Sequence, residues 1–583
     1  MVSTERRVWQ YAHVDQESIR RLAAELQISP LLARVLVARK IHTREMGLKF
    51  FSRKLSELHD PEQLPGISQA ADRIVEAIKH QRLITIYGDY DVDGVTATSL
   101  LWHCIRLAGG RSEYYIPARL EEGYGLNSTA IETLAAQDPS QLVVSVDCGI
   151  TSLIEARRAR ELGLELIITD HHQFAENFPE ETILVHPRLP GSSYPFGELC
   201  GAGVAFKLAW AVCARLGDGK KASPRMKEFL LSAIGLAAIG TVADVVPLMG
   251  ENRVLVHYGL STIGEKSSIG LKALIKAAGL HEKTSLAADD IGFSLGPRIN
   301  AAGRLGQARL AVELLTTDNE DRAQKLAAYL DELNKQRQSL ERKMFKQAKD
   351  LVNDHPAWSE EKALVLTHDE WHAGVIGIVA GKVAESFQRP AILLGPSTSA
   401  DILQGSGRSF AGFNLHEGLV ACREHLITFG GHHAAVGMKL SRKHLEAFRA
   451  SLVDFVSQNH SVEPGSAPLP IDAEVTFQEI STRAIEELDL LAPFGSANPR
   501  PMFAATRVEL AAPPKTMGEG GRHLSLLLKQ HDKTLRAVAF GQGEWADEIA
   551  AHAAIHLAFQ PIINEFRGQR NVDLHIKDWA PAT

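Results

Sequence analysis

Three aspartates stand at alternate positions in the glycine-flanked segment 88–94, GDYDVDG, directly after a short apolar run. If the backbone stays extended there, the carboxylates of Asp89, Asp91 and Asp93 lie on one side of the chain. Three crowded negative charges are costly unless cations neutralise them. A solvated acidic turn is the plain alternative, but the apolar run and the flanking glycines favour a metal site.

Other acidic and imidazole side chains also follow apolar runs. Asp147 and the tripeptide Asp170-His171-His172 each come directly after such a run, and Asp244 lies in the apolar segment GTVADVVPL. A DHH tripeptide alone occurs by chance, and a histidine at a strand end is more often structural. A buried aspartate, however, needs a partner or a metal. Together these residues suit two divalent cations, and oxygen plus imidazole ligands favour Mn²⁺ or Mg²⁺.

The apolar runs before these residues predict the element that positions them. They are short and separated by helical patterns, which is typical of a parallel α/β sheet. Ligands bind at the carboxyl ends of strands in such sheets. The predicted strands are 83–87, 142–146, 164–169 and 183–185.

One long helix is predicted over 319–352, where leucines recur at helical spacing without glycine or proline. About 33 residues would span roughly 50 Å. A second α/β pattern follows, with strands at 363–366 and 391–394 around a helix near 375–386. We therefore interpret the long helix as a connector between two lobes rather than as an ordinary surface helix.

The remaining segments are less regular. Glycine-rich loops are expected at 404–410 and 429–437, a proline-rich linker at 459–470, and helices without a motif over residues 1–60. Short strand-like runs after the linker suggest a small β-barrel. These runs are 473–477, 502–510, 523–528, 534–540 and 554–559.

Composition sets broad limits. A chain of 583 residues predicts about three to four domains. The net charge of −7 gives no basic bulk signature, so a nucleic-acid partner must be argued from local sites. Five cysteines without a CxxC pair fit a reducing cytoplasm better than a disulfide framework. The polar start of the chain is unlike a secretory signal.

One apolar stretch, 229–249, could suggest a membrane span. It holds only 15 uncharged residues before Asp244, whereas a spanning helix needs roughly 20. We interpret it as a buried helix that leads into a loop, and we expect no membrane partner.

The acidic and histidine segments resemble, in order, the four motifs of the DHH phosphoesterase superfamily. The form GDYDVDG is similar to the RecJ family rather than to the pyrophosphatase and small-nucleotide phosphatase branches. Later segments agree: 371–380 resembles the start of the family's second lobe, 405–409 and 429–437 its substrate loops, and 491–499 the segment that leads into its OB-fold.

The resemblance implies a fold and an activity. The fold would be α/β, with a DHH parallel-sheet lobe, a long helix, a DHHA1-type α/β lobe and a C-terminal OB-fold β-barrel. The activity would be a metal-dependent 5′→3′ exonuclease of single-stranded DNA that releases 5′-mononucleotides in DNA repair and recombination. The implied domains are an N-terminal helical segment (1–60), the DHH catalytic domain (61–318), the connecting helix (319–354), the DHHA1 substrate-binding domain (355–458) and the OB-fold domain (465–583).

The resemblance also implies residue roles at the metals. Asp147 would bridge two ions, His172 would face the scissile phosphate, and Asp170 would orient the histidine pair. Two ions ~3.5–4 Å apart can generate a hydroxide and clamp the attacking and leaving oxygens, so no serine or cysteine nucleophile is needed. The other implied ligands are Asp89 and Asp91 for one ion, and Asp93, His171 and Asp244 for the other.

Substrate contacts are expected in glycine-rich turns, where backbone N–H groups approach phosphate and arginine bonds it bidentately. Arg408 is therefore either a phosphate ligand, which Ser406 would assist, or an ordinary turn arginine. Arg119 is similar to a RecJ position near the 5′ phosphate, and Tyr124 stacks on a base or packs within its loop. The other candidates are one of Arg298 and Arg304 beside the nucleic-acid backbone, and His432 and His433 in the second substrate loop.

Two rival functions stay open. Another enzyme of the superfamily would act on pyrophosphate or short oligonucleotides; the barrel and the GDYDVDG form argue against it, and digestion of a long strand discriminates. A non-enzymatic binding module would lack metal-dependent turnover, yet every expected acidic and histidine position is filled. The resemblance further implies work with single-strand-binding protein and a repair helicase, although the sequence reveals no docking site.

Overall fold

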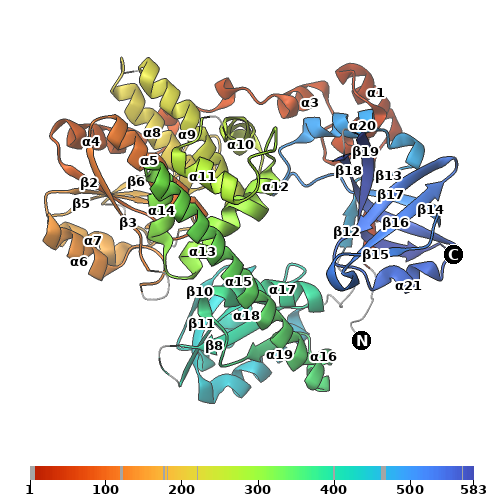
Figure 1. Ribbon diagram of the computed structural model, residues 1–583. Coiled ribbons are helices and arrows are strands. Elements are labelled where there is room, and N and C mark those ends of the chain that lie inside the picture. Colours follow the sequence, from red (N-terminus) through yellow and green to blue (C-terminus); the bar gives the residue numbers. More distant parts are fainter. Residues whose placement is uncertain are drawn as a thin grey trace.

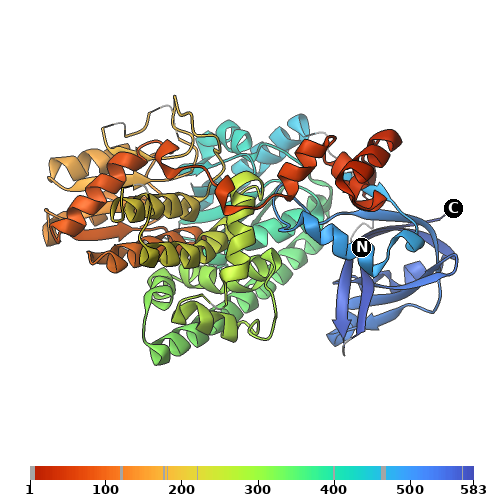
Figure 2. The same cartoon turned by 90° about the horizontal axis from the view of Figure 1, so that it is seen from above.

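The computed structural model shows two α/β lobes and a β-barrel lying side by side (Figure 1). The barrel stands apart from the two lobes when the molecule is seen from above (Figure 2). The described residues are 7–118, 122–174, 177–179, 181–219, 221–264, 266–397, 399, 401–460, 468–566 and 569–582.

The first lobe is built on a five-stranded, fully parallel sheet with the order β3-β2-β4-β5-β6. All four predicted strands are confirmed. The sequence missed the fifth, β3, because this edge strand (RSEYY) has exposed polar positions and no continuous apolar run. The strands are β2 (Leu83–Tyr87), β3 (Arg111–Tyr115), β4 (Leu142–Val146), β5 (Glu165–Thr169) and β6 (Ile183–Val185).

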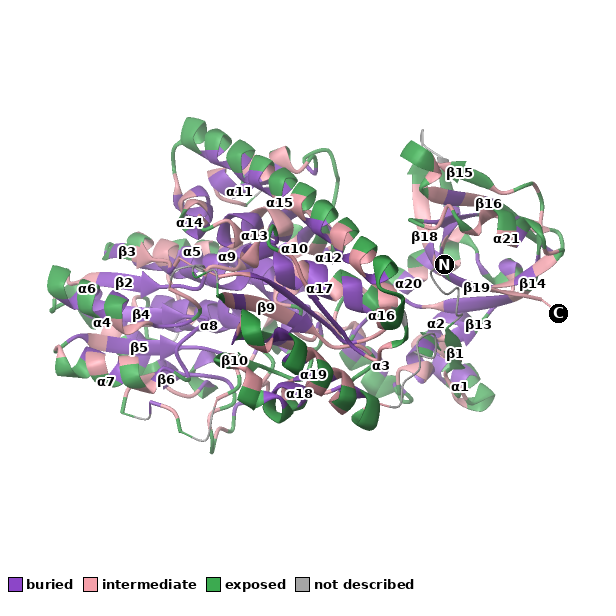
Figure 3. Ribbon diagram, turned by 90° about the horizontal axis from the view of Figure 1, so that it is seen from below, coloured by how far each residue is buried: buried purple, intermediate pink, exposed green. Residues whose placement is uncertain are grey.

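Helices cover both faces of this sheet, so its central strands are buried (Figure 3). Alternate residues of β4 enter the two cores: Val144 packs with one helical layer and Val143 with the other. The first layer holds α4 (Ile67–Lys79), α5 (Val92–Leu107), α8 (Gly201–Arg215) and α9 (Pro224–Ala243); the second holds α6 (Ser128–Gln137) and α7 (Leu153–Glu161). The lobe is completed by α10 (Gly250–Thr262), α11 (Ile269–Ala277), α12 (Ala288–Asp290), the π-helix η3 (Ile291–Leu295), α13 (Gly296–Arg304) and α14 (Ala308–Thr316).

Helix α9 contains most of the apolar stretch 229–249. Among the described residues it alone is long and apolar enough to suit a membrane span, and 56% of its most apolar window is buried in the fold. The core of the first lobe takes up side chains such as Leu230 and Ile234. The prediction that this stretch is a buried helix is confirmed.

The long helix is α15 (Glu320–Asp354), and it joins the two lobes as predicted (Figure 1). Leu326 and Leu330, in its first half, belong to the core of the first lobe. Met344 and Val352, in its second half, belong to a core of the second lobe. Because one continuous helix is part of both cores, it fixes how the lobes face each other.

The second lobe has a mixed sheet with the order β10-β11-β9-β8-β7, in which only β7 and β8 are parallel. The strands are β7 (Leu364–Thr367), β8 (Ala391–Pro396), β9 (Ile402–Arg408), β10 (Thr428–Gly431) and β11 (Ala435–Ser441). The helices are α16 (Pro356–Glu360), α17 (Ala373–Phe387), α18 (Leu415–Ala421) and α19 (Leu445–Asn459).

The prediction of loops at 404–410 and 429–437 is wrong for most of both segments, because they form β9, β10 and the start of β11. Glycine here permits close approach of neighbouring strands rather than a turn. A Cβ at Gly405 would lie 2.2 Å from the carbonyl oxygen of Leu393 on β8. The antiparallel pairing therefore depends on the glycines that suggested loops.

The C-terminal sheet has the order β13-β14-β18-β19-β17-β16-β15, and pairing of β14 with β16 closes it into a barrel. The predicted barrel is confirmed, although the sequence missed the long strand β19. Its strands are β13 (Ala473–Glu474), β14 (Phe503–Leu510), β15 (Lys515–Met517), β16 (His523–Gln530), β17 (Lys533–Ala539), β18 (Ala554–Phe566) and β19 (Gln569–Pro581); α20 (Thr482–Leu488) and α21 (Trp545–Ala550) pack on it.

The N-terminal segment packs on this barrel and is not entirely helical. Its strand β1 (Val8–Tyr11) pairs in parallel with β12 (Pro468–Ile471), so residues 468–470 of the predicted linker form a strand. Residues 461–467 of that linker lie outside the described residues. The helices α1 (Gln16–Leu26), α2 (Pro30–Ala38) and α3 (Arg44–Phe51) share a hydrophobic core with the barrel.

A buried arginine ties the barrel to the first lobe. The guanidinium of Arg253, on α10, donates hydrogen bonds to the carbonyl oxygens of Leu491 (2.8 Å) and Phe50 (3.2 Å). The backbone N–H of Leu248 donates to the carbonyl oxygen of Ser496 at 2.9 Å. The segment that leads into the barrel therefore rests on the residues that follow Asp244.

Candidate metal centre

The carboxyl ends of β2, β4 and β5 carry the predicted acidic and histidine residues. The chain does not stay extended through GDYDVDG, which was the condition for the three carboxylates to lie on one side. Asp91 is instead the N-cap of α5, and its side chain accepts hydrogen bonds from the backbone N–H groups of Asp93 (2.8 Å) and Gly94 (3.1 Å). The free N–H groups at a helix start explain this turn.

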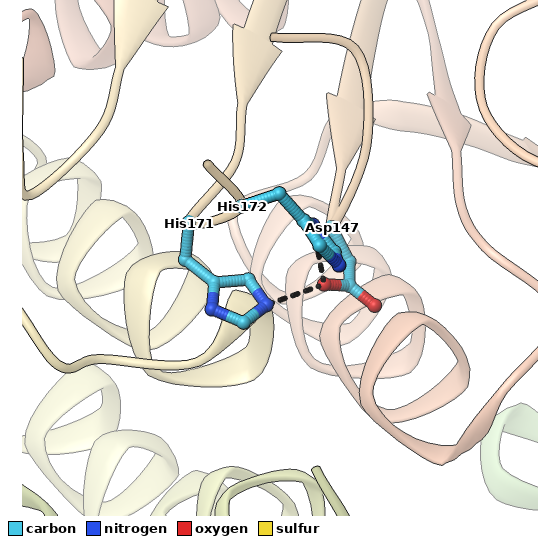
Figure 4. Close-up of side chains that lie close together, drawn as sticks. All are labelled: Asp147, His171 and His172. Carbon is cyan, nitrogen blue, oxygen red and sulfur yellow. Dashed lines mark ion pairs between the residues drawn. The ribbon is translucent and has the colours of Figure 1, made fainter. Parts of the chain in front are cut away.

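The side chains nevertheless converge. Figure 4 shows His171 and His172 pointing toward Asp147. The Nε2 atom of His171 lies 3.2 Å from Oδ1 of Asp147, 3.5 Å from Oδ2 of Asp244 and 3.7 Å from Oδ2 of Asp93. Three groups each have ligand atoms within 4.8 Å of one another: Asp89, Asp91 and Asp147; Asp93, His171 and Asp244; and Asp147, His171 and His172.

This convergence leaves buried polar atoms without hydrogen bonds. Within the described part of the chain, neither Oδ1 of Asp147 nor Nε2 of His171 has a hydrogen-bond partner. Burying such an atom unpaired costs about 1–3 kcal/mol. Burial and then the neighbouring carboxylates raise the pKa of Asp147 well above its usual value, and the pKa of Asp244 to about 8. A donor set of this kind fits divalent cations, which would relieve the repulsion and coordinate the unpaired atoms.

The backbone at Asp147 is also unusual. Its φ of +63° lies in the left-handed region, which non-glycine residues rarely adopt. Strain of this kind clusters at functional sites, where surrounding structure enforces it. It directs the carboxylate into the space between the other ligands.

Asp170 organises the two histidines. Its Oδ1 accepts hydrogen bonds from the backbone N–H of His171 (2.7 Å) and from the N–H and Nδ1 of His172 (3.1 and 2.8 Å). Burial opposes the charge on His172, but the hydrogen bond and the charge of Asp170 outweigh it and raise the pKa of His172 to about 9. The imidazole side chain of His172 is 40% exposed.

Tyr124 is tied to the same place. Its hydroxyl lies 3.1 Å from the carbonyl oxygen of Asp147 and 2.9 Å from Nδ1 of His172. Its ring meets the His172 ring edge-on, with centroids 5.4 Å apart, and the residue is 49% exposed. The exposed part of the Tyr124 side chain is accessible to a bound molecule.

The candidate substrate-binding residues of the second lobe lie toward the first lobe. Ser406 and Arg408, on β9, lie against α17, where a Cβ at Gly377 would be 3.3 Å and 3.1 Å from their side chains. Burial lowers the pKa of His432, and so do the charges of His433, Arg408 and His172, so His432 lies within electrostatic reach of the first lobe. A cavity of about 480 Å³ separates Glu122 and Gly123 from strands β9 to β11.

The other predicted cations differ in their surroundings. Arg298 pairs with Asp331 of α15 at 2.9 Å, which offsets its charge. Arg304 donates to the carbonyl oxygen of Gly374, in the second lobe, at 3.1 Å. Arg119 lies outside the described residues.

Two glycines that shape the ligands were not predicted from the sequence. The backbone N–H groups of Gly201 (2.6 Å) and Ala202 (2.8 Å), at the start of α8, donate to the Asp93 carboxylate. A Cβ at Gly201 would lie 2.6 Å from Oδ1 of Asp147, and one at Gly240 would lie 2.4 Å from Oδ1 of Asp93. A glycine inside a helix pattern was the available signal, since it usually has a packing reason.

Gly240→Ala is expected to damage the site while improving the helix. Alanine is worth up to about 1 kcal/mol over glycine inside a helix, which offsets part of the strain of a Cβ that would also lie 2.6 Å from the Cβ of Ala202. The added methyl group would displace the Asp93 carboxylate, and misplacement by about 1 Å can cost about 100-fold in rate. The measurement is hydrolysis against Mn²⁺ concentration. Gly235→Ala in the same helix is the control, because its Cβ would meet the side chain of Ile263 at 3.2 Å; equal activity of both variants would contradict the assignment of Asp93.

Comparison with known proteins agrees with this geometry. Models of the DHH family N-terminal domain, the DHHA1 domain and the RecJ OB domain match residues 83–237, 360–458 and 471–578. The single-stranded-DNA-specific exonuclease RecJ of Bacillus subtilis (strain 168) is 38% identical over 98% of this chain and 70% of its own length. That of Dickeya dadantii (strain 3937) is 35% identical over 96% and 98%.

Solved structures give the same result. The crystal structure of RecJ in complex with Mn²⁺ from Thermus thermophilus has a TM-score of 0.84 and 31% identity, covering 100% of this chain and 80% of that one. The complex of the same protein with Mg²⁺ has a TM-score of 0.78 and 30% identity, over 100% and 79%. The resemblance noted in the sequence is confirmed, and the chain belongs to the RecJ family.

Proposed function

We propose that this chain is a metal-dependent exonuclease that degrades single-stranded DNA from the 5′ end and releases 5′-mononucleotides. The observation that carries the proposal is the set of three acidic and histidine groups, two of which share Asp147 and two of which share His171. Family membership supports the substrate, because the curated relatives are named single-stranded-DNA-specific exonucleases.

The proposed cofactors are two divalent ions, Mn²⁺ or Mg²⁺, as bound by the Thermus thermophilus protein. Two such ions, when bound, supply an activated water and neutralise charge on the phosphate. The proposed ligands are Asp89, Asp91 and Asp147 for one ion, and Asp93, His171 and Asp244 for the other. Asp147, with Oδ1 at 3.2 Å from Nε2 of His171, would bridge to the second ion.

The chain's own residues position the phosphate. We assign His172, protonated and held by Asp170, to donate to a phosphate oxygen, and Tyr124 to hold the backbone of Asp147 and the His172 ring. Arg408, Ser406, His432 and His433 would bind the strand from the second lobe. Arg119 would join them at the 5′ phosphate. One of Arg298 and Arg304 would contact the DNA backbone. Arg298 pairs with Asp331 on α15, and Arg304 donates to the carbonyl oxygen of Gly374 in the second lobe.

The direct test uses single-stranded DNA labelled at either end, with Mn²⁺. Early release of a 5′ label as a mononucleotide supports the proposal. Release from the 3′ end would overturn the polarity, and hydrolysis of pyrophosphate but not of a long strand would favour the other superfamily enzymes.

We also propose that the enzyme works in the cytoplasm, in DNA repair and recombination, with a helicase and single-strand-binding protein. The support is the single-strand specificity in the relatives' names, since duplex DNA must first be unwound. Addition of a repair helicase should convert a blunt duplex from a resistant substrate into a degraded one. Unchanged resistance would contradict the helicase partnership.

Removal of the barrel is expected to weaken strand binding more than chemistry. The N-terminal helices share the barrel's core, so deletion of 465–583 alone would expose their apolar faces. The better variant keeps residues 54–460, which include every proposed metal ligand and the cores of both lobes. It should still cleave at high enzyme concentration while binding long strands less tightly; equal affinity to that of the full chain would exclude a binding role for the barrel.

A further inference from the structure

The loop that follows Asp244 is held in a strained conformation. Asp244 is the C-cap of α9, and the next residue, Val245, has a φ of +61°. The left-handed region is a genuine outlier for a β-branched side chain. The Val245 side chain is 67% exposed, so its own packing does little to hold it there. Strain of this kind persists only where the surrounding structure enforces it.

The enforcing contact comes from the barrel-entry segment, residues 491–499. The backbone N–H of Leu248, further along the loop, donates to the carbonyl oxygen of Ser496 at 2.9 Å. A Cβ at Gly495 would lie only 2.7 Å from Cδ1 of Leu248. The Leu248 side chain cannot easily give way, because it is 2% exposed and belongs to the same small core as Ala238 on α9. The barrel-entry segment therefore interlocks with the loop.

Buried hydrogen bonds make the barrel-entry segment a firm partner. Asn498 is 1% exposed, and its side-chain amide donates to the carbonyl oxygens of Leu491 (2.8 Å) and Pro493 (2.7 Å). From α10, the side-chain amide of Asn252 donates to the carbonyl oxygen of Pro247 in the loop at 3.1 Å. The strained loop is therefore held from the barrel side and from the first lobe.

The position of Asp244 depends on this loop more than the positions of the other ligands do. Its side chain is 22% exposed, whereas those of Asp93 and Asp147 are 1% and 2% exposed. The Asp93 carboxylate accepts two hydrogen bonds from the start of α8. Within the described part of the chain, the Asp244 carboxylate accepts no hydrogen bond of that kind. Its place beside the other ligands is set by the backbone where α9 ends.

We propose that Gly495 and Ser496 are positioning residues for Asp244. Their contact with Leu248 keeps Val245 in its strained conformation, and this conformation keeps the Asp244 carboxylate beside the other ligands. Docking of the barrel on the first lobe thus sets the affinity of one metal ion. The inference deepens the proposed function and rests on it, because it concerns one of the two proposed ions.

The effect is confined to that ion. Without the contact, Val245 relaxes and the end of α9 no longer presents Asp244 to Asp93 and His171. The other proposed ion keeps its ligands, which follow β2 and β4. A fragment without the barrel, such as residues 54–460, therefore needs a higher Mn²⁺ concentration for cleavage than the full chain does.

The test is a titration of the full chain with Mn²⁺, in which electron paramagnetic resonance of the free ion gives the number of bound ions and their Kd without turnover. Gly495→Ala should weaken one of the two sites by about 10- to 100-fold, as loss of an outer support for a ligand does, and leave the other unchanged. Asp244→Ala identifies the affected site, because it removes the ligand itself. Adding Val245→Gly to Gly495→Ala should restore most of the affinity, since glycine adopts a positive φ without strain.

Gly47→Ala is the matched control. Its Cβ would lie 2.5 Å from Cδ1 of Leu26, so it places a similar clash between α3 and α1, away from the loop, and should leave both affinities unchanged. If Gly495→Ala does not fold, Leu248→Ala takes its place, because it removes the contact without adding atoms.

Three results would overturn the proposal. They are Mn²⁺ binding by Gly495→Ala equal to that of the wild type, equal weakening of both sites, and a loss that Val245→Gly does not restore. Failure of the proposed function would look different, since the wild type would then bind Mn²⁺ without degrading a single strand.

Discussion

We expect Asp147→Ala to lower the rate of hydrolysis by several orders of magnitude without unfolding the protein. Asp147 contributes to two of the three convergent ligand groups, so its loss would affect both proposed ions. Without metal, the variant should be as stable as the wild type or more so, because burial and four neighbouring aspartates oppose the charge of this carboxylate. The measurements are the rate with excess Mn²⁺ and the melting temperature with and without the ion.

The metal-dependent gain in stability distinguishes a ligand from a merely structural residue. A ligand at 100 times its Kd stabilises the folded state by about 2.7 kcal/mol, and Asp147→Ala should lose most of that gain. Asp138→Ala removes a half-buried carboxylate that accepts hydrogen bonds from Ser140 at the end of α6, and it should keep both the gain and the rate. Near-normal nuclease activity of Asp147→Ala with excess metal would exclude the site as assigned.

The ligands were predictable because each follows an element with a strong local pattern. The strands β2, β4 and β5 are short, largely apolar and followed by Asp-containing segments. The apolar run and the polar residues after it therefore indicate the same strand end. The path of the chain between the ligands was not predictable in the same way. Asp91 turns the backbone as a helix cap, and the sign of φ at Asp147 depends on its packed surroundings.

The errors share a physical cause, which is dependence on distant contacts. The glycines of β9 to β11 indicate loops locally, but their lack of side chains lets strands approach closely. The packing of the N-terminal helices on the barrel involves residues more than 400 positions apart. The pairing of Arg298 with Asp331 likewise appears only once α15 is placed beside α13.

Arg408→Ala should weaken the discrimination between 5′-phosphate and 5′-hydroxyl strands. Arg408 and Ser406 lie together against α17, and Ser406 lines a cavity that Glu122 and Gly123 of the first lobe also line. The proposed pocket for a terminal phosphate would anchor there the end from which degradation starts. A hydrogen bond to a charged group is worth roughly 1.5–3 kcal/mol, so the preference should fall by about tenfold to a hundredfold.

The decisive quantity is the ratio of kcat/KM for the two substrates at fixed salt, since phosphate contacts release counterions. Arg408→Lys should recover only part of the preference, because an ammonium keeps the charge but loses the planar fork. Arg423→Ala removes an exposed cation from the same lobe and should leave the ratio unchanged. A ratio in Arg408→Ala equal to that of the wild type would place the terminal phosphate elsewhere, and digestion by the wild type from the 3′ end would remove the reason for such a pocket.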